Sequence, residues 1–204
     1  MMKRSIFFVA IAILFIFNII CIIKITKTTN AQKKIFHLYE NMSNVQSFLI
    51  NNISDSFKFD DQKMKSDIFL YTDSHDSIHI SNVFKDGKKL VFRYTVGSCE
   101  SCVDQEIEYL QKIFAKNPDD VIILTWYENQ RDFIIFKRKH QLILPIYNVK
   151  SIGKNHPGSN PYFFVSDSAL NVKLYFMPMP FFSQLTLSYL NIIQERFFYE
   201  KQFD

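Results

Sequence analysis

A pair of cysteines three positions apart stands where an apolar, strand-like run gives way to a helix-like run. Residues 90–96 have the composition of a central strand, and Gly97 and Ser98 lead from it to Cys99 and Cys102. The first turn of a helix exposes N–H groups that stabilise a thiolate, and this spacing also permits a disulfide. The motif therefore predicts reversible thiol–disulfide chemistry, with half of a zinc site or a fixed structural disulfide as alternatives.

The apolar residues after the cysteines recur at helical spacing. Val103, Ile107, Leu110 and Phe114 would form one stripe that faces a core. A strand, a dithiol and an amphipathic helix in that order favour the redox interpretation over the other two.

Size and charge limit the classes of protein to consider. The chain has 204 residues, of which 48% are hydrophobic, and it contains 22 Phe and 10 Tyr, which is ample for one folded domain with appendages. The formal net charge is +4, but six basic and no acidic residues precede Glu40, so the remainder is slightly acidic. We expect no nucleic-acid partner.

An apolar run covers residues 5–23, close to the roughly 20 residues that cross a bilayer as a helix. We expect residues 1–27 to be a single-pass anchor in the inner (cytoplasmic) membrane, with the C-terminal domain on the extracytoplasmic, periplasmic side. A cleaved secretory signal, processed near Ala31, is the alternative. Cys21 is predicted to be a buried thiol within the span rather than a lipidation site. Beyond the span, Cys99 and Cys102 can pair only with each other, and an oxidising compartment favours their disulfide.

Residues 28–65 read as a helical stalk or connector that ends in a loop or irregular extension after about residue 50. Its apolar residues from Ile35 to Leu49 cover too few repeats to favour a dimerising coiled coil. Strands are then predicted at 68–71, 78–80, 90–96, 121–126, 143–147, 162–165 and 172–176, and helices at 102–115, 130–140 and 183–200. That order indicates an α/β domain with a mixed sheet.

The order of elements, the dithiol at the strand-to-helix junction and Asn160-Pro161 before a Phe-rich strand resemble the thioredoxin fold. More narrowly, they resemble the membrane-anchored thioredoxin-like and redoxin-like proteins of bacterial envelopes, in which a hairpin similar to residues 76–84 precedes the catalytic strand. The likeness covers about residues 66–200. We therefore expect residues 66–204 to form a thioredoxin-like domain, with a mixed central sheet flanked by helices.

The resemblance implies roles for four residues. Cys99 would be the exposed nucleophile and Cys102 the resolving cysteine. Pro161 would be a cis-proline facing the dithiol, and Asn160 before it would offer backbone hydrogen bonds to the substrate. From the residues alone, Pro161 could simply begin a strand, where its missing N–H does no harm. The implied partners are a protein thiol or disulfide and a redox partner, with no cofactor.

The sequence departs from the family pattern around the dithiol. Ser98 replaces the usual Trp, and Glu100 and Ser101 replace Gly-Pro, which is compatible with a degenerate, regulatory or substrate-specific member. The chain also places four carboxylates near the cysteines, at Glu100, Asp104, Glu106 and Glu108. They favour the start of a helix, and they disfavour a thiolate, so we expect a reducing or intermediate potential.

The main functional hypothesis is an anchored, possibly reductase-like thiol–disulfide oxidoreductase acting on extracytoplasmic proteins. Its rival is a non-catalytic binding or scaffold module with a fixed Cys99–Cys102 disulfide, docking through the aromatic residues 181–182 and 197–199. A peroxidase-like reaction would need Thr95 and Arg131 near the nucleophile. Zinc binding would need histidines such as His140 and His156, which lack finger-like spacing.

Overall fold

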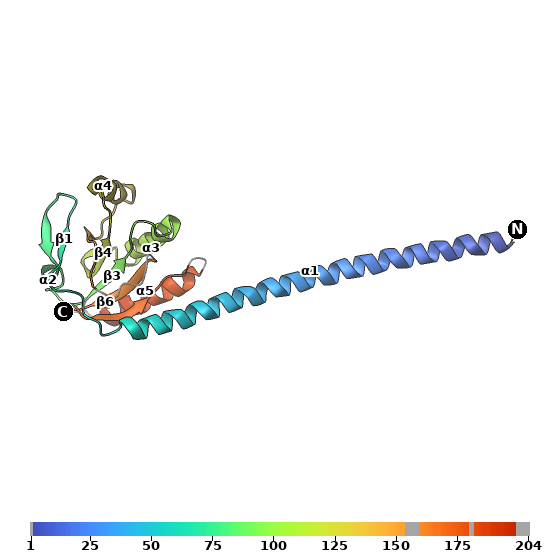
Figure 1. Ribbon diagram of the computed structural model, residues 1–204, viewed down its shortest axis with the longest axis horizontal. Coiled ribbons are helices and arrows are strands. Elements are labelled where there is room, and N and C mark those ends of the chain that lie inside the picture. The colour runs from blue at the N-terminus through green and yellow to red at the C-terminus, as the bar shows by residue number, and fades with distance from the viewer. Residues whose placement is uncertain (1, 154–159, 180–181, 199–204) are drawn as a thin grey trace. The chain divides into compact units, whose positions relative to one another are not determined.

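The computed structural model describes residues 2–153, 160–179 and 182–198, and of residues 2–16, 20 and 31 it describes the backbone alone. The chain divides into two units, Met1–Ile50 and Asn51–Asp204. Helix α1, Met2–Phe59, begins in the first unit and ends in the second (Figure 1). The predicted division into an anchor at 1–27, a connector at 28–65 and a domain at 66–204 stays a prediction.

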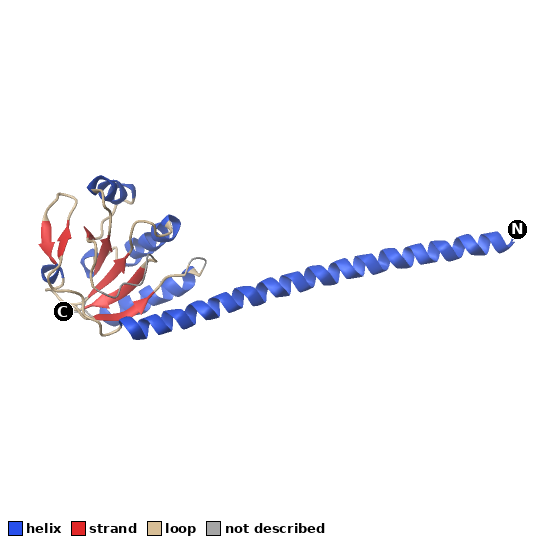
Figure 2. Ribbon diagram, in the orientation of Figure 1, coloured by secondary structure: helices blue, strands red, loops and turns tan. Residues whose placement is uncertain are grey.

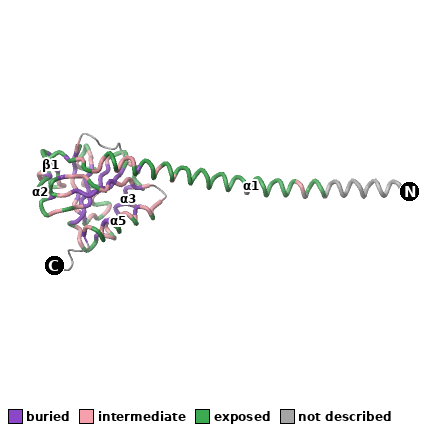
Figure 3. The backbone as a smooth tube through the Cα atoms, turned by 90° about the horizontal axis from the view of Figure 1, so that it is seen from below, coloured by how far each residue is buried: buried purple, intermediate pink, exposed green. Residues whose placement is uncertain are grey.

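The first unit is helical as far as it is described, because neither Gly nor Pro occurs before Gly87 to interrupt it. Its apolar residues Ile35, Leu38 and Met42 are exposed. Most residues of α1 whose burial is described are exposed (Figure 3). Most of the predicted membrane span, residues 5–23, lies outside the residues whose side chains are described. Within the described part, no helix has a stretch of the length and apolar character that crossing a membrane requires.

The second unit begins with the last turns of α1, so the expectation of a loop from residue 51 is wrong up to Phe59. The physical reason is a tertiary contact that no local pattern encodes. The side-chain amide of Asn52 donates to the Met177 carbonyl at 2.8 Å and accepts from the Met177 N–H at 2.7 Å. Irregular chain follows the helix, where Asp61 has a φ of 63°.

The following elements continue the second unit. They are β1 (Phe69–Tyr71), β2 (Ser77–His79), α2 (Ile80–Val83), β3 (Lys89–Arg93), α3 (Glu100–Ile113), η1 (Pro118–Asp120), β4 (Val121–Thr125), α4 (Gln130–Lys139), β5 (Ile146–Asn148), β6 (Tyr162–Ser166), β7 (Val172–Phe176) and α5 (Ser183–Phe197). The seven strands form one sheet in the order β2-β1-β5-β4-β3-β6-β7 (Figure 2).

The sheet is mixed. Strands β3, β4 and β5 are parallel, with β4 at the centre, whereas antiparallel pairing adds β6 and β7 on one side and β1 and β2 on the other. All five residues of β4 are buried, as the continuous apolar run predicted for a strand covered on both faces. At the β7 edge, Val172 donates to the Gln62 carbonyl at 2.7 Å and accepts from the Asp61 N–H at 2.8 Å.

Two cores form on the two faces of the sheet. One face packs against α3, α4 and α5 through residues such as Phe92, Ile107 and Phe133. The other face packs against α2 and the segments around Met64 and Ile152. This arrangement is a thioredoxin-like α/β fold with a mixed sheet, as the order of elements predicted.

Candidate functional site

The two cysteines lie at the start of α3, after the carboxyl end of β3, an interior strand between β4 and β6. Cys99 is the N-cap residue of α3, and its carbonyl accepts from the N–H groups of Cys102 at 3.1 Å and Val103 at 3.0 Å. The two residues form a disulfide with their Cα atoms 5.3 Å apart. Cys99 is exposed and Cys102 is half-buried. Of the two residues, Cys99 is therefore the more accessible to solvent.

A tight turn carries the chain from β3 to Cys99. Gly97 has a φ of 97°, which is accessible to glycine and strained for other residues. A Cβ there would meet no atom within 4 Å, so the requirement is for backbone conformation rather than for space. The Ser98 N–H donates to the Thr95 carbonyl at 3.0 Å, and the Val96 N–H donates to the Trp126 carbonyl at 3.2 Å. The turn is thus fixed both within itself and to the chain after β4.

Ser101 lies beside the exposed sulfur. Its Oγ is 3.3 Å from Cys99 Sγ, within hydrogen-bonding range of a sulfur atom. A hydroxyl in this position can donate to a thiolate once the disulfide is reduced. Ser101, which stands where the family pattern has proline, therefore supplies a polar contact to Cys99 Sγ.

The four carboxylates near the dithiol do not share one environment. Glu100 and Asp104 are ion-paired with Lys139 at the end of α4, and Asp104 also lies beside His140, whereas Glu108 is exposed. The hydrogen bond from Lys139 lowers the pKa of the Glu100 carboxyl. Fewer carboxylates near the dithiol are therefore unpaired than the sequence suggests, which weakens the argument for a reducing or intermediate potential. That potential stays a prediction, and titration against glutathione would test it.

Glu106 is the carboxylate that sequence reasoning misjudged, because it lies inside the protein. It is 4% exposed, and its Oε1 accepts a hydrogen bond of 3.4 Å from Thr186 Oγ1. Burial raises the pKa of this carboxyl to about 7. A signal was present in the sequence, since Glu106 follows Val103 by three residues on the apolar stripe. Glu106 is also one helical turn after Cys102, on the same face of α3.

Aromatic residues pack together just after the carboxyl ends of β3 and β4. Tyr94 follows β3 and Tyr127 follows β4, and their hydroxyl oxygens are 3.5 Å apart. Both rings pack against Phe136 on α4, with centroid distances of 5.3 and 5.7 Å. Burial raises the pKa of Tyr127 and, more strongly, that of Tyr94, so both phenols stay protonated at neutral pH.

Pro161 lies at the same edge of the sheet as the dithiol. Strand β6 runs antiparallel to β3 with Tyr162 opposite Arg93, so the residue before Tyr162 lies beside the carboxyl end of β3. Pro161 is buried, and Asn160 is exposed with its side-chain amide 3.7 Å from Met177 Sδ. No contact described in the structure tests the substrate-binding role of these two residues, which stays a prediction.

The expected cis peptide bond before Pro161 is wrong. No cis bond occurs in the described parts of the chain, which include both Asn160 and Pro161. The trans form found here is the intrinsically preferred isomer of an X–Pro bond, by about 0.5–1 kcal/mol.

Two alternative chemistries lack support in the described residues. Arg131 is exposed in the first turn of α4, and no described contact joins it to Cys99, as a peroxidase-like site would require. Within residues 2–153, 160–179 and 182–198, no group of three or more His, Cys, Asp or Glu side chains could hold a metal ion. His156 lies outside these residues.

The aromatic surface required by the scaffold hypothesis is partly internal. Phe198 is 2% exposed and packs edge-on against Phe114, with ring centroids 6.0 Å apart. Phe197 is half-buried, and Phe181 and Tyr199 lie outside the described residues. The prediction that Phe198 belongs to an exposed docking surface is wrong, because the residue completes the core at the end of α5.

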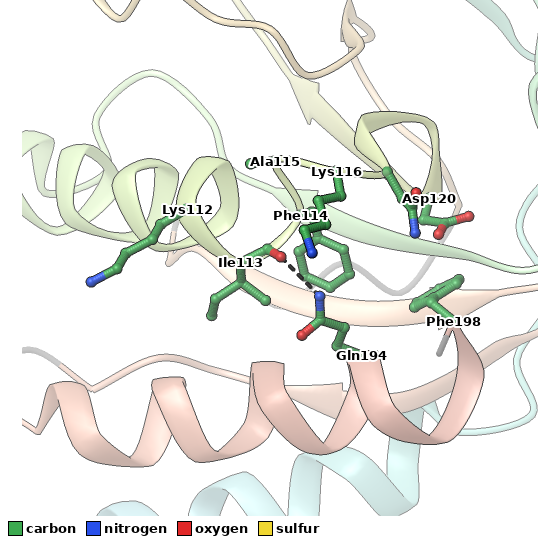
Figure 4. Close-up of a pocket in the computed structure, with 9 residues that line it drawn as sticks. Lys112, Ile113, Phe114, Ala115, Lys116, Asp120, Gln194 and Phe198 are labelled. Atoms are coloured by element: carbon green, nitrogen blue, oxygen red, sulfur yellow. Dashed lines mark hydrogen bonds between the residues drawn. The ribbon is translucent and has the colours of Figure 1, made fainter. Parts of the chain in front are cut away.

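A cavity of about 260 Å³ opens at the other end of α3 from the cysteines (Figure 4). It lies between the carboxyl end of α3 and the end of α5, where Gln194 Nε2 donates to the Ile113 carbonyl at 2.8 Å. Its lining includes Lys112, Lys116 and Phe198. The cavity is therefore no part of the dithiol site.

The fold and the dithiol define a thioredoxin-like domain that carries a C-x-x-C disulfide. No family model and no curated protein matches the chain. A putative electron transfer protein from Aquifex aeolicus VF5 is a similar solved structure, with 13% identity and a TM-score of 0.48 over 69% of this chain and 98% of that one. Another is a thiol:disulfide interchange protein from Bacteroides sp., with 11% identity and a TM-score of 0.46 over 66% and 89%. The thioredoxin domain of a thiol-disulfide oxidoreductase from Bacteroides vulgatus has 14% identity and a TM-score of 0.48 over 67% and 97%.

Proposed function

We propose that the protein is a thiol–disulfide oxidoreductase that acts on protein disulfides through Cys99 and Cys102. The observation that carries the proposal is the placement of the pair at the first turn of α3, with Cys99 exposed and Cys102 half-buried. An exposed sulfur can meet a large substrate, and the free N–H groups of the helix start favour its thiolate.

The reaction proceeds in two exchanges. The Cys99 thiolate attacks one sulfur of a substrate disulfide, which breaks the substrate S–S bond, forms a mixed disulfide and releases one substrate thiolate that takes up a proton. The Cys102 thiolate then attacks Cys99 Sγ, which forms the Cys99–Cys102 disulfide and releases the second substrate thiol. Two electrons pass from the protein to the substrate, so a dithiol-containing redox partner must reduce the pair before the next cycle.

Cys102 must lose its proton before the second exchange. Glu106 lies one helical turn further along α3, and burial raises the pKa of its carboxyl to about 7. A group whose pKa lies near the working pH is well matched to accept and return a proton. We therefore assign proton acceptance from Cys102 to Glu106.

The test is reduction of insulin disulfides by the full chain with dithiothreitol as the reductant. We expect the wild-type protein to accelerate reduction, and Cys99→Ser to abolish the acceleration. Cys21→Ser is the matched control, since it removes the one cysteine outside the pair. If the wild-type protein is as inactive as Cys99→Ser, the scaffold module with a fixed disulfide is the better account.

The clients can be identified by trapping. A Cys102→Ser variant completes only the first exchange, so the substrate stays covalently attached to Cys99. Mass spectrometry of the trapped species would identify the client, and loss of the adduct in a Cys99→Ser, Cys102→Ser variant is the control.

We also propose that the dithiol works on the extracytoplasmic side of a membrane, held by the apolar run at residues 5–23. Supporting this are the length and composition of that run and the absence of other cysteines from the sequence beyond it. A membrane-impermeant maleimide should label reduced Cys99 in intact cells, and labelling only after lysis would refute the location. The N-terminal sequence of the mature chain would distinguish an anchor from a cleaved signal.

A further inference from the structure

The last residue of α4, Lys139, contacts the first turn of α3. Lys139 Nζ is 2.7 Å from Glu100 Oε1 and 3.3 Å from Asp104 Oδ2. Glu100 stands between the two cysteines in the sequence, and Asp104 follows Cys102 by two residues. One lysine therefore binds both carboxylates that lie closest to the dithiol along the chain.

His140 lies next to this contact. Its side chain is only 11% exposed, its Nε2 is 3.2 Å from Asp104 Oδ1, and its ring packs on Phe136 with centroids 4.5 Å apart. Its carbonyl accepts a hydrogen bond of 3.3 Å from Gln111 on α3. The carboxyl end of α4 is thus docked on α3 by the Gln111 hydrogen bond. The reach of Lys139 to Glu100 follows from that docking.

The charges around Cys99 decide how much of it is thiolate. Unpaired carboxylates beside a thiol disfavour its ionised form, and a cation favours it. Exposed ion pairs contribute little to folding stability, and both Glu100 and Lys139 are well exposed. The principal consequence of the pair is therefore electrostatic and local to the sulfur.

We propose that Lys139 is a positioning residue for the dithiol, which neutralises Glu100 and Asp104 and so keeps the Cys99 thiolate available for attack. The inference rests on the proposed function, since it concerns the reactivity of the same nucleophile. The residue acts through the two carboxylates and needs no contact with the substrate.

The test is the rate of iodoacetamide alkylation of Cys99 across pH, measured by peptide mass spectrometry on the full chain in a Cys102→Ser background. We expect Lys139→Gln to slow alkylation at pH 7 about threefold and to move the midpoint of the pH profile upward by about half a unit, because the charges of Glu100 and Asp104 would no longer be balanced beside a solvated thiol. Lys139→Arg keeps the charge and should keep the rate.

Two further variants separate electrostatics from structure. Lys137→Gln removes an equal charge from the same helix, but Lys137 pairs with Asp73 at 2.7 Å, so the rate should stay at the unmutated value. Glu100→Gln combined with Lys139→Gln removes both charges and should restore the rate lost in Lys139→Gln. The proposal is overturned if Lys139→Gln reacts like the parent, if Lys137→Gln slows alkylation equally, or if the double variant stays slow.

Alkylation needs no substrate turnover, so its outcome is separable from that of the insulin assay. Absence of insulin reduction together with slower alkylation in Lys139→Gln would refute the proposed function and leave the role of Lys139 standing. Insulin reduction by the wild type, together with unchanged alkylation in Lys139→Gln, would support the proposed function and refute the role of Lys139.

Discussion

Thr186 on α5 donates a hydrogen bond of 3.4 Å to Glu106 on α3, and the second oxygen of Glu106 has no hydrogen-bond partner among the described residues. A half-satisfied carboxyl inside the protein is costly when it is charged. Its pKa is about 7, compared with an ordinary value of 4.5. Glu106 therefore stabilises the fold fully below about pH 4.5, and that contribution is lost as the pH rises through about 7.

We expect Glu106→Gln to remove this pH dependence. The free energy of unfolding at pH 8 should rise by about 2–3 kcal/mol relative to the wild type and change little at pH 4. Urea denaturation at both pH values measures the difference. Glu108→Gln, an exposed change on the same helix, is the control, and equal behaviour of the two variants would contradict the assignment.

The turn that presents Cys99 depends on the left-handed conformation of Gly97, with its φ of 97°. We expect Gly97→Ala to lower the free energy of unfolding by about 1–2 kcal/mol, because alanine is strained there. Insulin reduction should slow as well, since the turn carries the nucleophile. Gly153→Ala, at a position without a positive φ, should be neutral or slightly stabilising in the same denaturation experiment.

Asn52 holds the last turns of α1 to the chain after β7 through its paired hydrogen bonds with Met177. Asn52→Ala would leave the Met177 N–H and carbonyl without these partners and should cost about 1–3 kcal/mol. Asn51→Ala, an exposed neighbour on the same helix, should cost less than about 0.5 kcal/mol. Faster hydrogen exchange at the Met177 amide in the first variant alone would confirm the local cause.

Phe198 fills the core at the end of α5 against Phe114. Phe198→Ala should cost about 3–5 kcal/mol, because it removes a buried aromatic ring and leaves a cavity. Ile192 is 58% exposed on α5, so Ile192→Ala should change the thermal midpoint little. A small effect of Phe198→Ala would show that the ring serves a surface role instead.

Local patterns were sufficient to predict the elements around the dithiol. Val103, Ile107, Leu110 and Phe114 recur at helical spacing and are all buried, because a single apolar stripe has only one way to face the sheet. The two apolar runs on either side of Asp167 and Ser168 predicted a hairpin. The antiparallel pair of β6 and β7 confirms it.

Contacts between residues far apart in the sequence were not predicted. Lys139 and Glu100 are separated by 39 residues, and nothing in either segment signals the ion pair. The burial of Arg93 at 2% exposure is equally hidden, since the residue ends an apolar strand where a polar side chain normally meets water. Sequence periodicity shows which face of an element is buried, but it does not show which residues of α3 and α4 meet.

The hydrogen bonds that Val172 forms with Asp61 and Gln62 affect how the protein behaves in concentrated solution. They occupy backbone donors and acceptors that an outermost strand would otherwise present as a template for self-assembly. A neighbouring copy therefore cannot pair a strand with the backbone of Val172, whose N–H and carbonyl are already hydrogen-bonded. At this residue the protein's own chain prevents another copy from adding a strand.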